Sequence, residues 1–217
     1  MIRHALAPHV PSAAASLGVP RVLPPSASGV ALTFDDGPHP EGTPAVLEVL
    51  ASAGARATFF LIGEQVERRP ALVREIVEGG HLVALHGYKH SLQLRLSSGA
   101  VRADVVRGKA VVEDAAGTSV HHHRPPYGLY SAAGLAVVRA SGMEPMLWSR
   151  WGKDWRKFTT PDRIAARVTT NVGPRDIILL HDADFYSAKG SHQHTVIALK
   201  TILTALDAAE LDTVLAV

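Results

Sequence analysis

The stretch Val30-Ala31-Leu32-Thr33-Phe34-Asp35-Asp36-Gly37-Pro38 joins an apolar run to two adjacent carboxylates. The run from Val30 to Phe34 is β-branched and aromatic, which predicts a buried strand, and Gly37-Pro38 ends it in a turn. Two carboxylates at a buried strand end are costly unless a metal, a cation or a catalytic role uses their charge. Because neighbouring residues of a strand point to opposite sides, one carboxylate can bind a metal while the other faces a substrate. The alternative is a helix N-cap.

The composition indicates one folded domain. The 217 residues suffice for a full α/β core, and 47% are hydrophobic against 19% charged. We expect no membrane span, because no run of about 18 apolar residues occurs, and a net charge of +2 without a dense Lys/Arg run gives no indication of nucleic-acid binding. With no cysteine, the 12 histidines are the available ligands besides carboxylates for a transition metal.

The first 28 residues are rich in Ala, Pro and Ser, and Pro8, Pro11 and Pro20 interrupt every apolar stretch. We therefore predict an N-terminal arm over residues 1–28, not a signal peptide, and one domain over residues 29–217. A chain of this kind is expected in the cytoplasm.

Strand and helix signals alternate after the arm. The predicted strands are 30–34, 57–62, 81–86, 119–124, 144–148, 175–180 and 212–217. The predicted helices are 45–51, with Thr43 as N-cap, 71–78, 99–116, 131–141, 161–170 and 195–209. This alternation predicts a parallel sheet with crossover helices, and seven strands favour a closed or distorted barrel over an open sheet.

Polar residues follow the predicted strands at their carboxyl ends. They are Asp35, Asp36, His86, His90, Arg124, Tyr127, Asp154, Trp155, His181 and Asp182. The carboxyl ends of parallel strands lie on one face of a barrel or open sheet, and that face carries the chemistry. We therefore expect these side chains to lie on the same face.

His86 and His90 are spaced as a metal-binding pair. Positions i and i+4 of a helical turn share a face, so both imidazoles can reach one ion. With Asp35 or Asp36 they give a His-His-carboxylate site with open positions, which suits zinc or another divalent transition metal acting on water and a carbonyl. A single His-x-x-x-His is often incidental, but this pair follows a buried strand on the face of the aspartates.

Arg124 and His181 each have a catalytic and a structural interpretation. Arg124 precedes the rigid Pro125-Pro126 turn, where its guanidinium either keeps a carboxylate ionised or forms a salt bridge under a loop. His181 ends a buried strand, either as a general acid or as a core histidine with satisfied hydrogen bonds. Charge pairing with Asp154 would raise the pKa of His181.

Together these segments resemble the five ordered motifs of the polysaccharide deacetylases, carbohydrate esterase family four with its nodulation-factor deacetylase homology domain. The matching segments are Thr33–Pro38, His86–His90, Arg124–Tyr127, Asp154-Trp155 and Leu179–His181. The resemblance spans residues 29–217 and implies a catalytic domain folded as a distorted (β/α) barrel of seven or eight strands. It also implies metal-dependent hydrolysis of an N-acetyl or O-acetyl group on a sugar.

The resemblance implies a role for each matched residue. Asp35 would be the catalytic base, and Arg124 would hold it. The metal ligands would be Asp36, His86 and His90.

The remaining matched residues would act on the acyl and leaving groups. The backbone N–H of Tyr127 would stabilise the oxyanion, and His181, tuned by Asp154, would protonate the leaving amine. Trp155 and Leu179 would line the pocket for the acetyl methyl group.

Two residues depart from the family pattern. Gly87 stands where the second motif usually has Ser or Thr, a residue that supports the loop and not the metal. Trp151 stands where the fourth motif usually has Asp, which puts in question the polar support under Arg124 and His181. We expect Trp151 to add an aromatic wall to the substrate pocket, suited to stacking on a sugar ring.

Other histidines are expected outside the metal site. Strand alternation would divide His121, His122 and His123 between two faces. A solvated loop after the sixth strand is predicted to hold His192 and His194, with Asp182 and Asp184.

The predicted function is a metal-dependent hydrolase that removes N-acetyl groups from an amino-sugar glycan or glycoconjugate. The alternatives are an O-acetyl esterase on xylan-like sugars, an amide or formamide hydrolase on a small molecule, and a non-catalytic sugar-binding module. Retention of Asp35 and His181 argues against the binding module. The expected metal is zinc, with cobalt or manganese as alternatives, and the expected partner is an acetylated carbohydrate; the sequence does not settle the oligomeric state.

Overall fold

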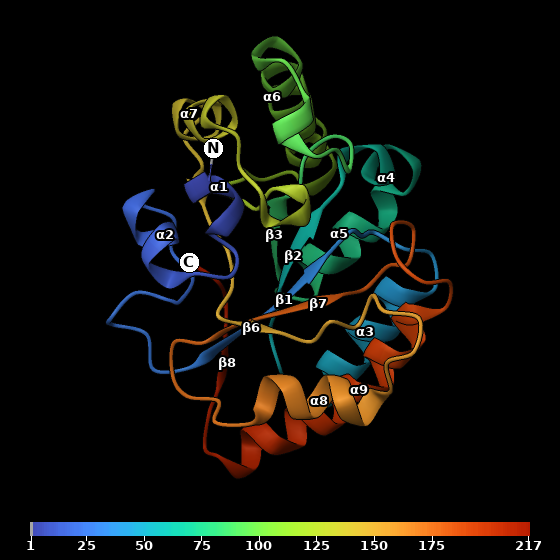
Figure 1. Cartoon of the computed structure of the whole chain (residues 1–217). Helices are drawn as coiled ribbons and strands as arrows, with labels where there is room; N and C mark the ends of the chain where they lie inside the picture. The colour runs from blue at the N-terminus through green and yellow to red at the C-terminus, as the bar shows by residue number, and fades with distance from the viewer. Residues whose placement is uncertain (1) are drawn as a thin grey trace.

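A curled parallel sheet organises the computed structural model, which describes residues 2–217 (Figure 1). Its strands are β1 (Val30–Asp35), β2 (Thr58–Leu61), β3 (Leu82–Leu85), β4 (His122–His123), β5 (Glu144–Pro145), β6 (Arg150–Trp151), β7 (Ile177–His181) and β8 (Thr213–Val214). The strand order is β5-β4-β3-β2-β1-β7-β6, with β8 paired to the start of β1, and every pair is parallel. This arrangement confirms the predicted distorted (β/α) barrel.

Helices form the crossovers between these strands. They are α3 (Gly42–Ser52), α4 (Gly63–Arg68), α5 (Pro70–Glu78), α6 (Ser98–Ala116), α7 (Ala132–Ala140), α8 (Pro161–Thr169) and α9 (Ser191–Ala208). Helix α4 and strand β6 were not predicted, because α4 has only 6 residues and β6 only 2, too few for a periodic pattern. The strand predicted at 144–148 is correspondingly shorter and ends at Pro145.

The N-terminal arm packs along the gap between β5 and β6. It contains α1 (Ile2–Leu6) and α2 (Pro11–Ser16), and Leu147, between β5 and β6, donates its N–H to Pro20 O at 2.9 Å. Farther along the arm, Leu23 N–H donates to Arg175 O at 2.8 Å, and the Leu23 side chain is buried in the main core. The arm therefore shares the core of the domain; the boundary predicted at residue 28 stays a prediction, and Met1 lies outside the described residues.

Strand β1 is the centre of the core. All six of its residues are buried, and Phe34 stacks on Phe59 of β2 with ring centroids 5.2 Å apart. Burying such a side chain contributes about 2 kcal/mol. The register pairs Asp35 with His181 of β7, so the carboxyl ends of the two strands lie side by side in a rigid frame.

The start of α3 corrects one prediction. The helix begins at Gly42, and Thr43 is not its N-cap. Instead, the Thr43 hydroxyl accepts the N–H of His39 at 2.7 Å and donates to the buried carboxylate of Asp182. Because α3 begins well after Asp36, the capping alternative for the aspartate pair is also wrong.

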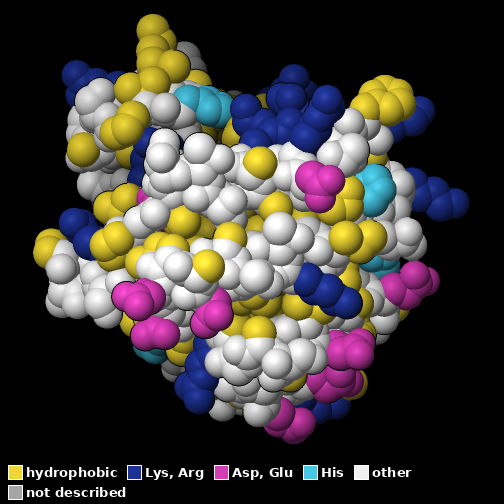
Figure 2. Space-filling view, turned by 90° about the horizontal axis from the view of Figure 1, so that it is seen from below, with side chains coloured by type: hydrophobic (Ala, Val, Ile, Leu, Met, Phe, Trp, Pro, Cys, Tyr) yellow, Lys and Arg dark blue, Asp and Glu magenta, His cyan; other side chains and the backbone are white. Residues whose placement is uncertain are grey.

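The underside of the molecule is formed by α8 and α9, and basic and acidic side chains are interspersed on it (Figure 2). Within residues 2–217, no helix has both the length and the apolar character needed to cross a membrane.

Candidate active site

The turn after β1 brings both aspartates to the same side. Asp36 has a φ of 81°, a conformation rare for a residue with a Cβ atom and costing of order 1–3 kcal/mol. As a result, Asp35 Oδ2 and Asp36 Oδ1 lie 3.7 and 3.5 Å from the same atom, His86 Nε2. The simple alternation expected for neighbouring strand residues therefore does not hold here, since Asp36 lies beyond the strand end.

Asp36, His86 and His90 form a three-ligand group. One ligand atom from each lies within 4.8 Å of the others, and His90 Nε2 is 3.4 Å from Asp36 Oδ1. The two histidines lie on a bend after β3, with Gly87 at φ 95°, and not on the helical turn that their spacing suggested. The loop therefore brings His86 and His90 to the same side, as the helical turn predicted from their spacing would have done.

The donor atoms of this group fit a divalent metal. His86 Nδ1–H donates to Arg124 O at 2.8 Å, which leaves the Nε2 lone pair directed at the aspartates. Asp36 Oδ1 is buried without a hydrogen-bond partner among residues 2–217. Two imidazoles and a carboxylate are a donor set typical of zinc and related ions.

Burial keeps the metal-binding group close to neutral. It lowers the pKa of His90 to about 3, helped by the nearby charges of His86 and His181, and it lowers the pKa of His86 well below its usual value. Burial also raises the pKa of Asp36 to about 7, with repulsion from Asp35 in the same direction and attraction from His181 opposing it. A cation bound between these groups would stabilise the ionised form of Asp36.

Arg124 forms a buried ion pair with Asp35. The buried guanidinium donates from Nη1 to Asp35 Oδ1 at 2.7 Å and to the Thr33 hydroxyl at 2.8 Å, and from Nη2 to Leu147 O at 3.1 Å. It also lies over the ring of Phe60, 3.9 Å from the centroid. Burial raises the pKa of Asp35, and the Arg124 charge opposes this rise. The pair lies inside the site, which favours an orienting role over a salt bridge under a loop.

His181 and Asp154 form the second charged pair. Asp154 is fully buried and accepts from His181 Nδ1 at 2.8 Å, from the His181 backbone N–H at 2.7 Å and from the Thr195 hydroxyl at 2.8 Å. Burial alone would lower the pKa of His181, but the charge and hydrogen bond of Asp154 outweigh it and raise the pKa to about 10. With this pKa, His181 is an imidazolium at neutral pH and carries a proton on both ring nitrogens.

Tyr127 contacts His90 through its side chain and has an unusual backbone conformation. Its φ is 62°, and its N–H takes part in none of the hydrogen bonds found in residues 2–217. The side chain is 58% exposed, and its ring meets His90 edge-on with centroids 4.6 Å apart. Tyr127 thus has an N–H without a partner among the described residues, and its oxyanion role stays a prediction.

The residues predicted to line the pocket differ in burial. Trp151 lies between Trp148 and Trp155, with ring centroids 5.4 and 6.2 Å away, and Trp155 is 37% exposed. Leu179 is buried in the core beside Trp151, its partner in the β6–β7 register. The three tryptophans form an aromatic row, and the role of Trp151 as a wall of the substrate pocket stays a prediction.

The two cationic side chains of the site differ in their polar support. Among the described residues, Arg124 Nε has no hydrogen-bond partner. His181 is supported by Asp154, which Thr195 in turn holds. The histidine therefore keeps the support that the Trp151 departure put in question, and the arginine has one nitrogen without a partner.

The comparison with known proteins agrees with this geometry. The profile of the polysaccharide deacetylase family matches residues 23–146. A chitooligosaccharide deacetylase of Azorhizobium caulinodans is 35% identical over 189 residues, covering 83% of this chain and 89% of that protein. The chain belongs to the polysaccharide deacetylase family.

Other polysaccharide deacetylases share both sequence and fold. A peptidoglycan-N-acetylglucosamine deacetylase of Bacillus cereus is 35% identical, covering 82% of this chain and 81% of that protein. The solved family 4 carbohydrate esterase of Streptomyces lividans, in complex with acetate, has a TM-score of 0.77 at 30% identity and covers 86% of this chain and 91% of its own. A family pseudoenzyme of Bacillus anthracis has a TM-score of 0.80 at 27% identity, covering 90% of this chain and 66% of its own, so the fold alone does not establish activity.

Two predictions about the remaining histidines were wrong in part. His122 and His123 are both buried, with only His121 exposed, because β4 lies inside the curled sheet. His192 belongs to the first turn of α9, which starts earlier than predicted, and is buried beside Asp184. The fully buried Asp182, whose pKa burial raises to about 7, is likewise no part of a solvated loop.

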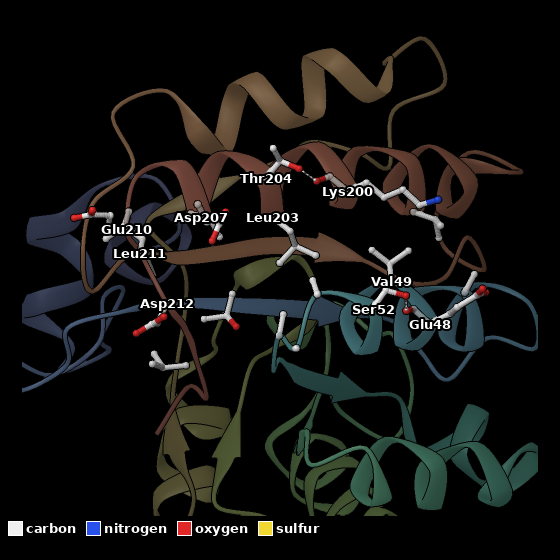
Figure 3. Close-up of a pocket in the computed structure, with 18 residues that line it drawn as sticks. Glu48, Val49, Ser52, Lys200, Leu203, Thr204, Asp207, Glu210, Leu211 and Asp212 are labelled. Carbon is white, nitrogen blue, oxygen red and sulfur yellow. Dashed lines mark hydrogen bonds between the residues drawn. The ribbon is translucent and has the colours of Figure 1, made fainter.

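One cavity of the polysaccharide deacetylase chain lies away from these residues. It has a volume of about 940 Å³ between α3, α9 and β8 (Figure 3). Its walls carry Glu48, Lys200 and Asp207, and it lies near the start of β1, where β8 pairs with Val30 and Ala31. The cavity therefore lies at the end of β1 opposite Asp35 and Asp36.

Proposed function

We propose that this chain is a metal-dependent deacetylase that hydrolyses the N-acetyl groups of an amino-sugar glycan. One observation carries the proposal: the Asp35–Arg124 pair, the Asp36–His86–His90 group and the His181–Asp154 pair meet at the carboxyl ends of β1, β3 and β7. A base, a metal-binding group and an acid are thus available around one reacting carbonyl.

A divalent metal held by Asp36, His86 and His90 would polarise the acyl oxygen and activate water. Asp35, whose ionised form the Arg124 charge favours against burial, takes the proton of the attacking water. The Tyr127 N–H donates to the acyl oxygen as negative charge develops on it. His181 Nε2–H then gives its proton to the leaving nitrogen, and Asp154 holds the imidazolium in place.

We infer that the metal is zinc, with cobalt and manganese as alternatives. Two neutral imidazoles and one carboxylate leave an open position for water, as catalytic zinc sites do. The absence of cysteine from the chain removes the thiolate ligands that would favour a closed structural site.

The protonation state of His181 favours an amide over an ester as the bond that is hydrolysed. An amine leaves poorly unless it is protonated, whereas an alcohol leaving an O-acetyl ester depends less on an acid. The Asp154 charge keeps His181 protonated throughout the neutral pH range, with a pKa of about 10. The similar chitooligosaccharide and peptidoglycan-N-acetylglucosamine deacetylases support the same choice, and the aromatic row at Trp151 and Trp155 suits a sugar ring.

A competition between two acetyl donors tests this choice. The zinc- or cobalt-loaded protein is incubated with N-acetylglucosamine oligomers and with acetylated xylan at equal acetyl concentration. We expect acetate release from the N-acetyl oligomers to dominate. Release from the xylan alone would contradict the proposal and favour the O-acetyl esterase.

Replacing Asp154 by Asn is expected to move the alkaline limb of the pH profile. In the wild type, His181 is protonated below a pKa of about 10, so activity that depends on its proton persists up to that pH and falls above it. Without the Asp154 charge, burial lowers the pKa of His181, and the limb moves to lower pH. At pH 8 we expect kcat/KM to fall about 100-fold, the size of a general-acid contribution.

The pH profile of kcat/KM from pH 5 to 11 measures this shift. Thr195→Val, which removes one neutral hydrogen bond to Asp154, serves as the matched control and should shift the limb far less. An Asp154→Asn profile lowered equally at every pH would contradict the role assigned to Asp154.

A further inference from the structure

A tyrosine from the loop between β7 and α9 covers one of the metal-binding histidines. The ring of Tyr186 stacks on the ring of His90, with centroids 4.3 Å apart and planes inclined by 10°. Tyr127 approaches the same imidazole edge-on. His90 is thus packed between two tyrosine rings contributed by loops far apart in the sequence.

His90 depends on this packing because it lacks the support that His86 has. His86 is oriented by the hydrogen bond from its Nδ1–H to Arg124 O. His90 Nδ1 is buried without a hydrogen-bond partner among residues 2–217. Histidine ligands almost always use their second ring nitrogen to fix the ring, so the ring of His90 must be fixed by other contacts.

Hydrogen bonds to α4 hold Tyr186 in place. Its hydroxyl donates to Glu64 Oε1 at 2.8 Å and accepts from Gln65 Nε2 at 3.1 Å. Gln65 is buried, and its Oε1 accepts from Arg69 at 2.8 Å. The ring of Tyr186 therefore connects the loop after β7 to the helix after β2, across the end of β1.

The base of the loop is fastened by Asp184. Its carboxylate accepts the N–H of Gly190 at 2.6 Å, and His39 Nε2 and His192 Nδ1 lie 3.3 and 3.4 Å from its oxygens. Phe185, next in the chain, packs on His39 with ring centroids 4.8 Å apart. These contacts tie the loop to the turn that follows β1 and to the start of α9.

His39, Asp184 and His192 have the composition of a metal site, but His39 lacks the hydrogen-bonding pattern of a metal ligand. Their ligand atoms lie within 4.8 Å of one another. However, His39 Nδ1 accepts the backbone N–H groups of Glu41 and Gly42 at 3.2 and 2.9 Å, so in the neutral ring the proton is on Nε2. A protonated Nε2, 3.3 Å from Asp184 Oδ1, has no lone pair for a metal, the reverse of His86.

We propose that Tyr186 is a positioning residue of the metal site, and that His39, Asp184 and His192 clamp its loop so that its ring sets the orientation of His90. The inference rests on the metal role of His90 in the proposed function. The loop after β7 would thus orient the His90 ring, as the hydrogen bond to Arg124 O orients the ring of His86.

Metal affinity of three variants tests the role of Tyr186. Tyr186→Phe keeps the ring, Tyr186→Leu keeps apolar bulk without the ring, and Phe158→Ala removes an aromatic ring that is 83% exposed in another loop. We expect zinc affinity, measured by competition with a chelator, to fall 10- to 100-fold in the Leu variant, the usual effect of losing support around a ligand. The zinc affinity of Tyr186→Phe should fall by less than about threefold, and that of Phe158→Ala should not change.

The visible absorption of the cobalt-loaded protein gives a second readout, because it responds to ligand geometry. We expect a changed spectrum for Tyr186→Leu and a wild-type spectrum for Tyr186→Phe. Wild-type affinity and spectrum in the Leu variant would overturn the inference and leave the proposed function intact. A wild-type protein that binds no zinc or cobalt would instead overturn the proposed metal site itself.

The number of bound ions tests the clamp. With zinc in excess, we expect one ion per chain, lost in a double His86→Ala, His90→Ala variant and kept in His192→Ala. A second ion per chain that disappears in His192→Ala would overturn the clamp and make His39, Asp184 and His192 a metal site.

Discussion

Replacing Asp35 by Asn is expected to abolish turnover while the protein keeps its metal. The amide has the shape of the carboxylate but cannot take a proton from water, so kcat should fall by about 10³, within the range of a general base. Metal content should not change, because Asp36, His86 and His90 provide the ligand atoms. The Asn oxygen can still accept from Arg124, which is buried and hydrogen-bonded to Thr33 and Leu147 as well.

Asp176→Asn is the matched control for this experiment. Asp176 is also paired with an arginine, Arg150, but it precedes β7 at the end of the sheet away from the site. We expect this variant to keep wild-type kcat. Metal content by elemental analysis and kcat on N-acetylglucosamine oligomers are measured for both proteins. An Asp35→Asn protein that retains more than about a tenth of kcat would contradict the assignment, because a general base contributes at least about 10².

Replacing both His86 and His90 by Ala is expected to remove the metal and, with it, all activity. Each imidazole offers its Nε2 to the same position beside Asp36 Oδ1, at 3.5 and 3.4 Å. Since losing mere support around a ligand weakens binding 10- to 100-fold, losing two ligands should weaken it by well over about 10². Asp36 alone cannot hold the ion against water or a chelator.

Elemental analysis after dialysis against a weak chelator measures this loss. His122→Ala serves as control, since His122 is also buried but belongs to β4 and to neither ligand group found among residues 2–217. Metal retained at the wild-type level in the double variant would contradict the ligand assignment.

Local patterns were sufficient to predict the frame of the site. The run Val30 to Phe34 predicted β1, and the polar residues after successive strands placed Asp35, His86, Arg124 and His181 on one face. Such patterns work because parallel strands expose their carboxyl ends together.

The positions of the side chains within the site could not be predicted from the sequence. A positive φ at Asp36 brings both aspartates to one side, and a bend, not a helix, brings His86 and His90 together. Neither leaves a periodic signal in the sequence. Tyr186 was missed because its contacts, with His90 and Gln65, are distant in sequence and arise only when the loop after β7 folds over β1.

Neither motif matching nor the fold alone establishes catalysis. Trp151 stands where the family motif usually has Asp, and Arg124 Nε has no partner among the described residues, yet Arg124 still binds Asp35 at 2.7 Å. A structurally similar protein is a pseudoenzyme of the family, so the fold alone does not establish activity.

Acetate release from N-acetylglucosamine oligomers tests the central claim most directly. Purified protein is stripped of metal, reloaded with zinc or cobalt, and assayed for acetate and for the free amine of the product. We predict equal amounts of acetate and amine from the reloaded protein, and neither from the stripped protein or from Asp35→Asn. A reloaded, metal-bound protein that releases no acetate from these oligomers would contradict the account.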